Sequence, residues 1–98
     1  MKLRLSVAAI SDVRQAILWW RANREAAPLL LEVELRDAFR LLRSSPLVGG
    51  SVAGEPGTRR LLLSRTRYLL FYDVASAKQE VLLLRVWHTS RGRPPRLR

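Results

Sequence analysis

The order of apolar and polar residues predicts an α+β protein with one strand, two helices and three further strands. Residues 2–5 alternate polar and apolar side chains, which is typical of a short strand. Apolar residues then recur at helical spacing as far as residue 44. Three runs rich in leucine, β-branched and aromatic residues follow, at about 59–64, 68–74 and 80–88. We therefore expect an antiparallel helical hairpin packed on a C-terminal antiparallel sheet.

Local signals set the boundaries of the two helices. Ser6 is the expected N-cap of the first helix, which should run to about Asn23. The second helix should begin at Pro28 and stop at Ser44-Ser45-Pro46. The apolar positions predict two core stripes: Ile10, Val13, Ile17 and Trp20 in the first helix, and Leu31, Leu35, Ala38, Phe39 and Leu42 in the second. Residues 47–58 hold four of the five glycines and are expected to form a loop without a phosphate-binding motif.

Both faces of the predicted sheet are largely apolar, and the hairpin can cover only one of them. Along 68–74, Tyr68, Leu70, Tyr72 and Val74 should share one face. The other face, with Leu83 and Trp87, is expected to remain open, and such a patch indicates a partner. Trp19 lies roughly 100° around the helix from Trp20, so the two indoles cannot share one stripe. Leu83, Trp87 and Trp19 are therefore the candidate partner contacts.

The positive charge is concentrated in the second half of the chain. The formal net charge is +10, of which residues 58–98 carry +8 and residues 1–57 only +2. Such a field attracts nucleic acid or acidic protein segments. The chain has no cysteine and no apolar run long enough for a membrane span. Its length of 98 residues predicts a single domain, 1–98, and the composition fits a cytoplasmic protein.

The tail, residues 89–98, carries four arginines and two prolines without an acidic residue, and we expect it to be irregular and flexible. Arg91-Gly92-Arg93-Pro94 also matches the core of a minor-groove AT-hook, which is a short and unspecific motif. Further arginines stand near the expected strand ends. The candidate anion- or target-binding residues are Arg59, Arg60, Arg65, Arg67 and Arg91.

His88 is the only histidine and the one side chain suited to acid–base chemistry near neutral pH. No hydrolase triad or metal cluster is evident, and Glu32 and Glu34 are expected on solvated helix faces. We expect neither a cofactor nor a metal.

Taken together, residues 2–95 resemble the RelE/ParE superfamily of type II toxins. Residues 6–20 resemble the first helix of that superfamily, and Ser45-Pro46-Leu47-Val48-Gly49 resembles the break after its second helix. The three C-terminal runs resemble its three strands: Arg59-Arg60-Leu61, Tyr68-Leu69-Leu70-Phe71-Tyr72 and Val86-Trp87-His88-Thr89-Ser90-Arg91. The resemblance implies a β-α-α-β-β-β fold and a toxin–antitoxin hetero-oligomer of the kind linked to plasmid stabilisation.

Two activities are implied by this resemblance. RelE-like members cut mRNA on the ribosome, whereas ParE-like members inhibit DNA gyrase without known hydrolysis. The chain has Leu69 where a RelE-like nuclease has an arginine, and no tyrosine follows Tyr72. Its ending is more ParE-like, so we expect gyrase inhibition, with mRNA cleavage as the alternative. Cleavage of RNA by a 2′-oxygen needs a base, an acid and cations around the phosphate, so the RelE-like alternative implies His88, Arg59 and Arg91 as catalytic candidates. Whether the chain is an enzyme depends on which of the two activities it has. A basic nucleic-acid-binding module and a decayed toxin that only binds antitoxin remain further alternatives.

The resemblance also implies an antitoxin whose acidic, partly disordered segment folds across the toxin. Trp19, Leu83 and Trp87 are the residues expected to meet it.

Overall fold

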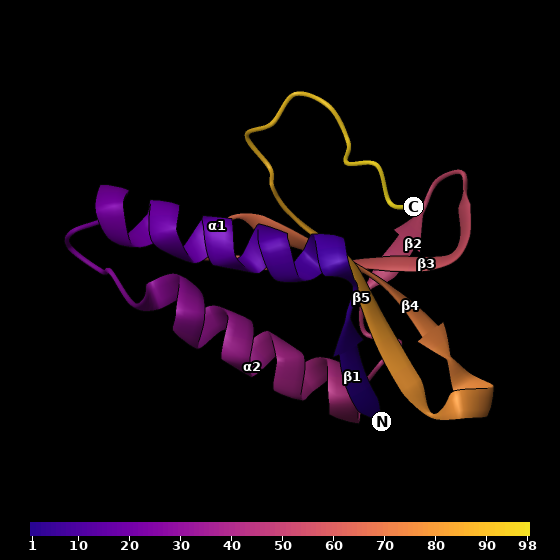
Figure 1. Cartoon of the computed structure of the whole chain (residues 1–98). Coiled ribbons are helices and arrows are strands. Elements are labelled where there is room, and N and C mark those ends of the chain that lie inside the picture. The colour runs from indigo at the N-terminus through magenta and orange to yellow at the C-terminus, as the bar shows by residue number, and fades with distance from the viewer.

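The computed structural model describes residues 1–98, and its strands form one five-stranded sheet (Figure 1). The strands are β1 (Lys2–Leu5), β2 (Gly50–Val52), β3 (Glu55–Leu62), β4 (Tyr68–Ala75) and β5 (Glu80–His88). Their spatial order is β1-β5-β4-β3-β2, with β1 parallel to β5 and the other neighbours antiparallel. A short 3-10 helix, η1 (Ser76–Lys78), joins β4 to β5. The predicted α+β class is confirmed.

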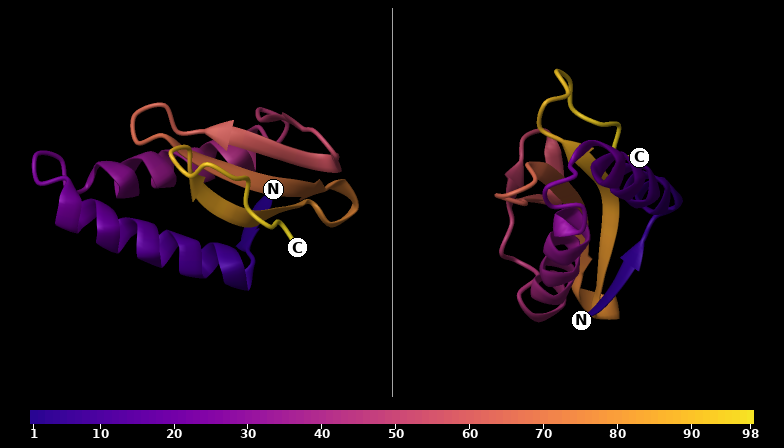
Figure 2. Two further views of the ribbon diagram at one scale, coloured as in Figure 1. Left: turned by 90° about the horizontal axis from the view of Figure 1, so that it is seen from above. Right: turned by 90° about the vertical axis from the view of Figure 1, so that its left-hand side faces the viewer.

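Two helices, α1 (Val7–Asn23) and α2 (Leu30–Ser44), form the predicted hairpin and lie side by side (Figure 2). α2 starts two residues after Pro28 and ends at the predicted serine. Neither helix is both long and apolar enough to cross a membrane. The apolar sides of the helices pack on one face of the sheet. The largest fully buried side chains of this core are Tyr72, Leu31, Leu42, Leu70, Leu83 and Val81.

α1 is attached directly to the edge of β5. The Ser6 hydroxyl accepts a hydrogen bond from the Ala9 amide at 3.0 Å, which confirms the predicted N-cap. The same hydroxyl donates to the Leu84 carbonyl at 2.8 Å. The residues that α1 buries against the sheet include Ala9 and Ala16, whose small side chains allow the helix to approach β5 closely. The predicted apolar stripe of this helix is partly wrong, because Ile10 is exposed.

Residues 47–58 contain more regular structure than the expected loop. β2 pairs with β3, with Gly50 opposite Arg60, and the two strands form a hairpin at the edge of the sheet. Gly54 and Gly57 have φ angles of +78° and +82°, which favour glycine in the turn and within β3. The glycines that predicted a loop thus provide the turn and the irregular register of a short hairpin.

A bulge in β5 changes which side chains share a face. Tyr72 lies opposite Leu83, but the preceding Phe71 lies opposite Arg85, so Leu84 is an extra residue in β5. As a result Leu83 is 0% exposed in the core beneath the helices. The prediction that Leu83 lies on an open face is therefore wrong, because simple alternation does not survive the bulge. The predicted alternation of β4 is confirmed.

The tail, residues 89–98, is irregular as expected, but it is attached across the face of the sheet that the helices leave free. The Trp87 indole donates to the Arg93 carbonyl at 3.0 Å, and Pro95 is buried. Arg98 forms an ion pair with Asp73 at 2.9 Å, so the chain end lies beside the strands in Figure 1. The chain itself therefore covers part of the expected open face, over β4 and β5, whereas Arg60 and Leu62 of β3 remain exposed.

Candidate functional site

A cleft of about 530 Å³ lies between the second half of α1 and the ends of β4 and β5. α1 contributes Asp12, Gln15, Ala16 and Trp19, whose spacing of three and four residues places them on one helix face. The other lining residues are Tyr68, Val86 and His88 from the sheet, with Arg24, Ser90 and Arg91 from the segments that follow α1 and β5. The cleft thus gathers the only histidine, two arginines and an exposed tryptophan.

Both ring nitrogens of His88 are bound within the chain. Nε2 lies 3.1 Å from the Thr66 carbonyl oxygen, which can only accept, so Nε2 carries the hydrogen. Nδ1 accepts from the Ser90 backbone amide at 3.0 Å, and the Ser90 hydroxyl lies 2.8 Å away. The ring also meets Tyr68 edge-on, with the ring centroids 4.8 Å apart. His88 is therefore held as one tautomer, and it has to release a partner before it can transfer a proton to a ligand.

The turn that binds His88 is itself held by α2. The Glu34 carboxylate accepts hydrogen bonds from the Arg65 and Thr66 amides, each at 2.9 Å, and from the Thr66 hydroxyl at 2.6 Å. Glu34 is therefore not the solvated residue that the helix pattern predicts. It fixes the β3–β4 turn, whose Thr66 carbonyl in turn orients His88. Sequence reasoning missed this role because the partners are about 31 residues away in the chain.

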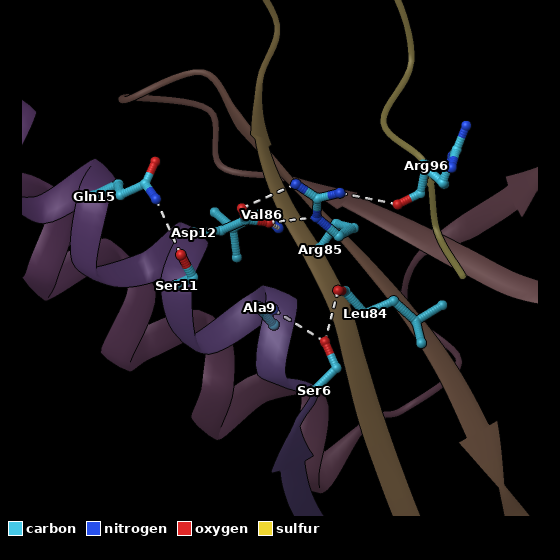
Figure 3. Close-up of polar contacts among 9 residues, drawn as sticks. All are labelled: Ser6, Ala9, Ser11, Asp12, Gln15, Leu84, Arg85, Val86 and Arg96. Carbon is cyan, nitrogen blue, oxygen red and sulfur yellow. Dashed lines mark hydrogen bonds and ion pairs between the residues drawn. The ribbon is translucent and has the colours of Figure 1, made fainter.

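Asp12, one of the residues that line the cleft, forms an ion pair between α1 and β5 (Figure 3). The Asp12 carboxylate accepts from Arg85 Nε at 2.7 Å and Nη2 at 3.0 Å, and from the Val86 amide at 3.0 Å. This hydrogen bonding to Asp12 raises the pKa of Arg85. The guanidinium also donates to the Arg96 carbonyl in the tail at 3.0 Å. β1 pairs only with residues 80–83, and the Asp12 carboxylate accepts the hydrogen bond of a backbone amide further along the same edge of β5.

The two arginines of the cleft have no carboxylate partner. The Arg24 guanidinium lies 5.0 Å from the ring centroid of Trp19, and that of Arg91 lies 4.0 Å from the centroid of Trp87. Every ion pair of the chain involves another arginine: Arg4, Arg21, Arg85 or Arg98. Arg24 and Arg91 are therefore positioned by aromatic rings and keep their charge available.

The predicted catalytic residues are only partly brought together. Arg91 and His88 line the same cleft. Arg59, however, donates to the Leu47 and Gly49 carbonyls at 3.2 and 2.8 Å and holds the segment after α2. It lies opposite Tyr72, whereas His88 lies opposite Tyr68, and four residues of strand correspond to roughly 13 Å.

The remaining predicted arginines lie on different surfaces. Arg60 is exposed opposite Phe71 on the face away from the helices. Arg65 and Arg67 are exposed in the β3–β4 turn, and Arg67 has a φ angle of 68°. The Thr89 amide donates to the Arg67 carbonyl at 3.0 Å, so this turn lies at the same end of the sheet as the cleft. These arginines extend the positive surface but do not form one site.

The three predicted partner contacts differ in their exposure. Trp19 is 46% exposed at the cleft and remains a candidate contact. Leu83 is fully buried and cannot meet a partner at the surface. Trp87 is half-buried, with Arg85 and Arg91 against its ring and the tail bonded to its indole nitrogen. No cluster of His, Asp and Glu side chains is arranged to hold a metal ion.

The electrostatics of the cleft can be tested through Tyr68. Burial raises the pKa of Tyr68, and the charges of Arg91 and Arg24 oppose this rise. Replacing either arginine with glutamine should therefore raise the pKa of Tyr68 further, because the phenolate loses a favourable cation. NMR titration of the tyrosine ring carbons measures the change, and Arg40→Gln on α2 is the control. Equal pKa values in all three variants would contradict the placement of the two guanidiniums.

Comparisons with known proteins agree with this architecture. The chain is similar to a protein of the chromosomal ParDE toxin–antitoxin system of P. aeruginosa, with a TM-score of 0.73 and 19% identity over 90% of this chain and 95% of the other. It is also similar to the isolated E. coli RelE toxin, with a TM-score of 0.59 and 21% identity over 93% and 86%. The E. coli RelBE toxin–antitoxin complex contains a chain with a TM-score of 0.59 and 21% identity, over 92% and 98%.

The similarity to these solved structures shows the fold, and a comparison of the sequence with known families shows the family. No curated protein matches the chain significantly. The family described as "ParE toxin of type II toxin-antitoxin system, parDE" matches residues 3–93, which is nearly the whole chain. The chain therefore belongs to the ParE toxin family, within the RelE/ParE superfamily of type II toxins.

Proposed function

We propose that this toxin inhibits DNA gyrase by binding to it, and that a cognate antitoxin neutralises it. The observation that carries the proposal is the separation of the groups that RNA cleavage requires. His88 has both ring nitrogens bound within the chain, and Arg59 is attached to backbone carbonyls roughly 13 Å further along the sheet. Such an arrangement favours binding over hydrolysis. The proposal places the protein in the cytoplasm, where gyrase acts.

RelE-like cleavage of mRNA is the second candidate. One observation favours it, since His88 and Arg91 line a common cleft. A proton donor or acceptor beside a phosphate-binding cation is a minimum for RNA cleavage. Arg24 supplies a second cation to this cleft, but both ring nitrogens of His88 are bound within the chain and no second histidine or free carboxylate is present to share the proton transfers.

A general nucleic-acid-binding role has less support. Sheet-based RNA-binding modules stack bases on exposed aromatic side chains. Here Tyr68, Phe71 and Tyr72 are buried, and Trp87 is covered by arginines and by the tail.

A groove between the helices is the surface we propose for the antitoxin. It measures about 320 Å³, and Val13, Ile17, Leu35 and Phe39 provide its apolar walls. Arg36 and Arg43 stand at its rim, beside Glu32. An amphipathic segment with acidic residues fits such a groove, and the net charge of +10 favours an acidic partner. Trp19, on a different side of α1, is the second proposed contact.

Two assays on one preparation of purified toxin test the proposed function. We expect the toxin to stop DNA supercoiling by gyrase and to leave ribosome-bound mRNA intact. His88→Gln should still arrest growth, because the histidine has no role as a catalyst in gyrase binding. Cut mRNA with normal supercoiling, abolished by His88→Gln, would overturn the proposal and establish the RelE-like alternative.

A further inference from the structure

The two guanidiniums of the cleft have no carboxylate partner and are held in place before any ligand arrives. The one hydrogen bond that either makes within the chain runs from Arg24 Nη1 to the Asn23 carbonyl oxygen at 3.3 Å. Arg24 lies between Trp19 and Trp20, at 5.0 and 5.6 Å from their ring centroids, and Arg91 lies on Trp87 at 4.0 Å. Cation–π contacts of this kind restrict a side chain without neutralising its charge. Ordering a flexible arginine is part of the cost of binding an anion, so this cost is reduced here.

A hydroxyl donor lies within the field of both cations. Tyr68 lines the cleft, and the charges of Arg91 and Arg24 both act on its phenol. Unlike the Tyr72 hydroxyl, which accepts from the Gly49 amide at 2.8 Å, the Tyr68 hydroxyl has no partner within the chain. Two guanidiniums and a hydroxyl suit a phosphate monoester, which carries close to two negative charges and offers several acceptor oxygens.

No acidic group of the cleft competes for these cations. Asp12 is its only carboxylate, and Arg85 and the Val86 amide occupy both of its oxygens (Figure 3). His88 is bound to Thr66 and Ser90. The field inside the cleft is therefore positive.

The other half of the cleft is apolar and aromatic. Trp19 is 46% exposed there, and Ala16 and Val86 are also part of the lining. The Gln15 amide nitrogen donates to Ser11 at 3.0 Å, which leaves its oxygen free to accept from a ligand (Figure 3). A volume of about 530 Å³ is within the range of small-molecule sites, roughly 300–1,000 Å³. An inorganic phosphate would leave this half empty, and a carboxylate side chain needs only one of the two arginines.

We propose that this cleft binds a nucleoside monophosphate, with the phosphate at Arg24, Arg91 and the Tyr68 hydroxyl and the base against Trp19. This small-molecule site shares Trp19 with the proposed antitoxin contacts and is otherwise separate from the groove between the helices. The nucleotide can be free, or it can be the 5′-phosphorylated end of a strand, because the recognised chemistry is the same.

Calorimetric titration of the full chain with AMP, adenosine, inorganic phosphate and a 5′-phosphorylated oligoadenylate tests the proposal. We expect AMP to bind at least about tenfold more tightly than adenosine or phosphate, because each of those lacks one half of the contacts. Arg24→Gln and Arg91→Gln should each weaken AMP binding about tenfold or more. Trp19→Ala should weaken the binding of AMP but not of phosphate. An oligoadenylate that binds more tightly than AMP, and through the same arginines, would identify a strand end as the source.

Matched variants separate this site from general charge effects. Arg40→Gln removes one charge from an exposed position on α2 and should leave AMP binding unchanged. Tyr68→Phe removes only the hydroxyl and should weaken AMP binding without unfolding the chain, which circular dichroism verifies. No AMP binding up to about 10 mM, equal affinity for phosphate and AMP, or equal losses in Arg40→Gln and Arg24→Gln would each overturn the proposal.

Discussion

Replacing Asp12 with alanine should lower the free energy of unfolding by about 2–3 kcal/mol. The side chains of Asp12 and Arg85 are only 13% and 19% exposed, so the variant leaves a largely buried guanidinium without its counter-charge. It also leaves the Val86 amide without an acceptor at the edge of β5. Urea denaturation of the isolated toxin, followed by circular dichroism, measures the loss.

Two further variants separate charge from hydrogen bonding in the Asp12 experiment. Asp12→Asn keeps an acceptor for the Val86 amide and should cost less than Asp12→Ala. Arg4→Gln breaks an ion pair with Glu80 in which the arginine side chain is 64% exposed, and it should change stability by less than about 0.5 kcal/mol. If Asp12→Ala costs no more than Arg4→Gln, the ion pair with Arg85 is not a main attachment of α1.

Replacing Gly49 with alanine should cost about 2–4 kcal/mol, because there is no space for a methyl group. A Cβ atom at this position would lie 2.6 Å from the Tyr72 hydroxyl and 2.7 Å from the Arg60 carbonyl oxygen. To relieve these contacts, the backbone at residue 49 has to move away from Tyr72 and Arg60. The hydrogen bond from the Gly49 amide to the Tyr72 hydroxyl at 2.8 Å is then lost. Thermal and urea unfolding both report the change.

The neighbouring glycine is a matched control. A Cβ atom at Gly50 meets nothing within 4 Å, so Gly50→Ala should stay within about 0.5 kcal/mol of the parent. Adding Tyr72→Phe to Gly49→Ala removes the closer of the two clashes and should restore part of the lost stability. Similar costs for the two glycine variants would show that the segment after α2 adapts freely.

Features that depend on local sequence could be predicted. Ser6 caps α1 because its hydroxyl needs only a partner three residues away. The apolar stripe of α2 and the alternation of β4 follow from the periods of a helix and a strand. Each of these signals lies within a few residues, so tertiary structure did not change them.

Features that depend on distant partners could not be predicted. Leu83 was assigned to the wrong face because the bulge at Leu84 resets the alternation of β5. The attachment of the tail to the sheet was not predicted, because its partners, among them Asp73, lie in distant parts of the sequence. β2 was not predicted because it lies in a glycine-rich segment, residues 47–58, that has the composition of a loop.

The cleft could be predicted in parts but not as a whole. Trp19, His88 and Arg91 were separate candidates, and they meet because α1 crosses the end of β5. Arg24 was missed because the turn after α1 has no periodic pattern. An arginine that closely follows two adjacent tryptophans was the one available signal, since a guanidinium at that distance can stack on an indole.

The pairing of β1 with β5 has a consequence for synthesis of the toxin. β5 lies between β1 and β4, so residues 2–5 obtain their sheet partner only when residues 80–83 are present. Until a ribosome has added β5, β1 has no sheet partner and β4 can pair only with β3, so the core cannot close. Contacts of such sequence separation form late in folding. The cell thus has an interval in which the chain exists but the folded toxin does not.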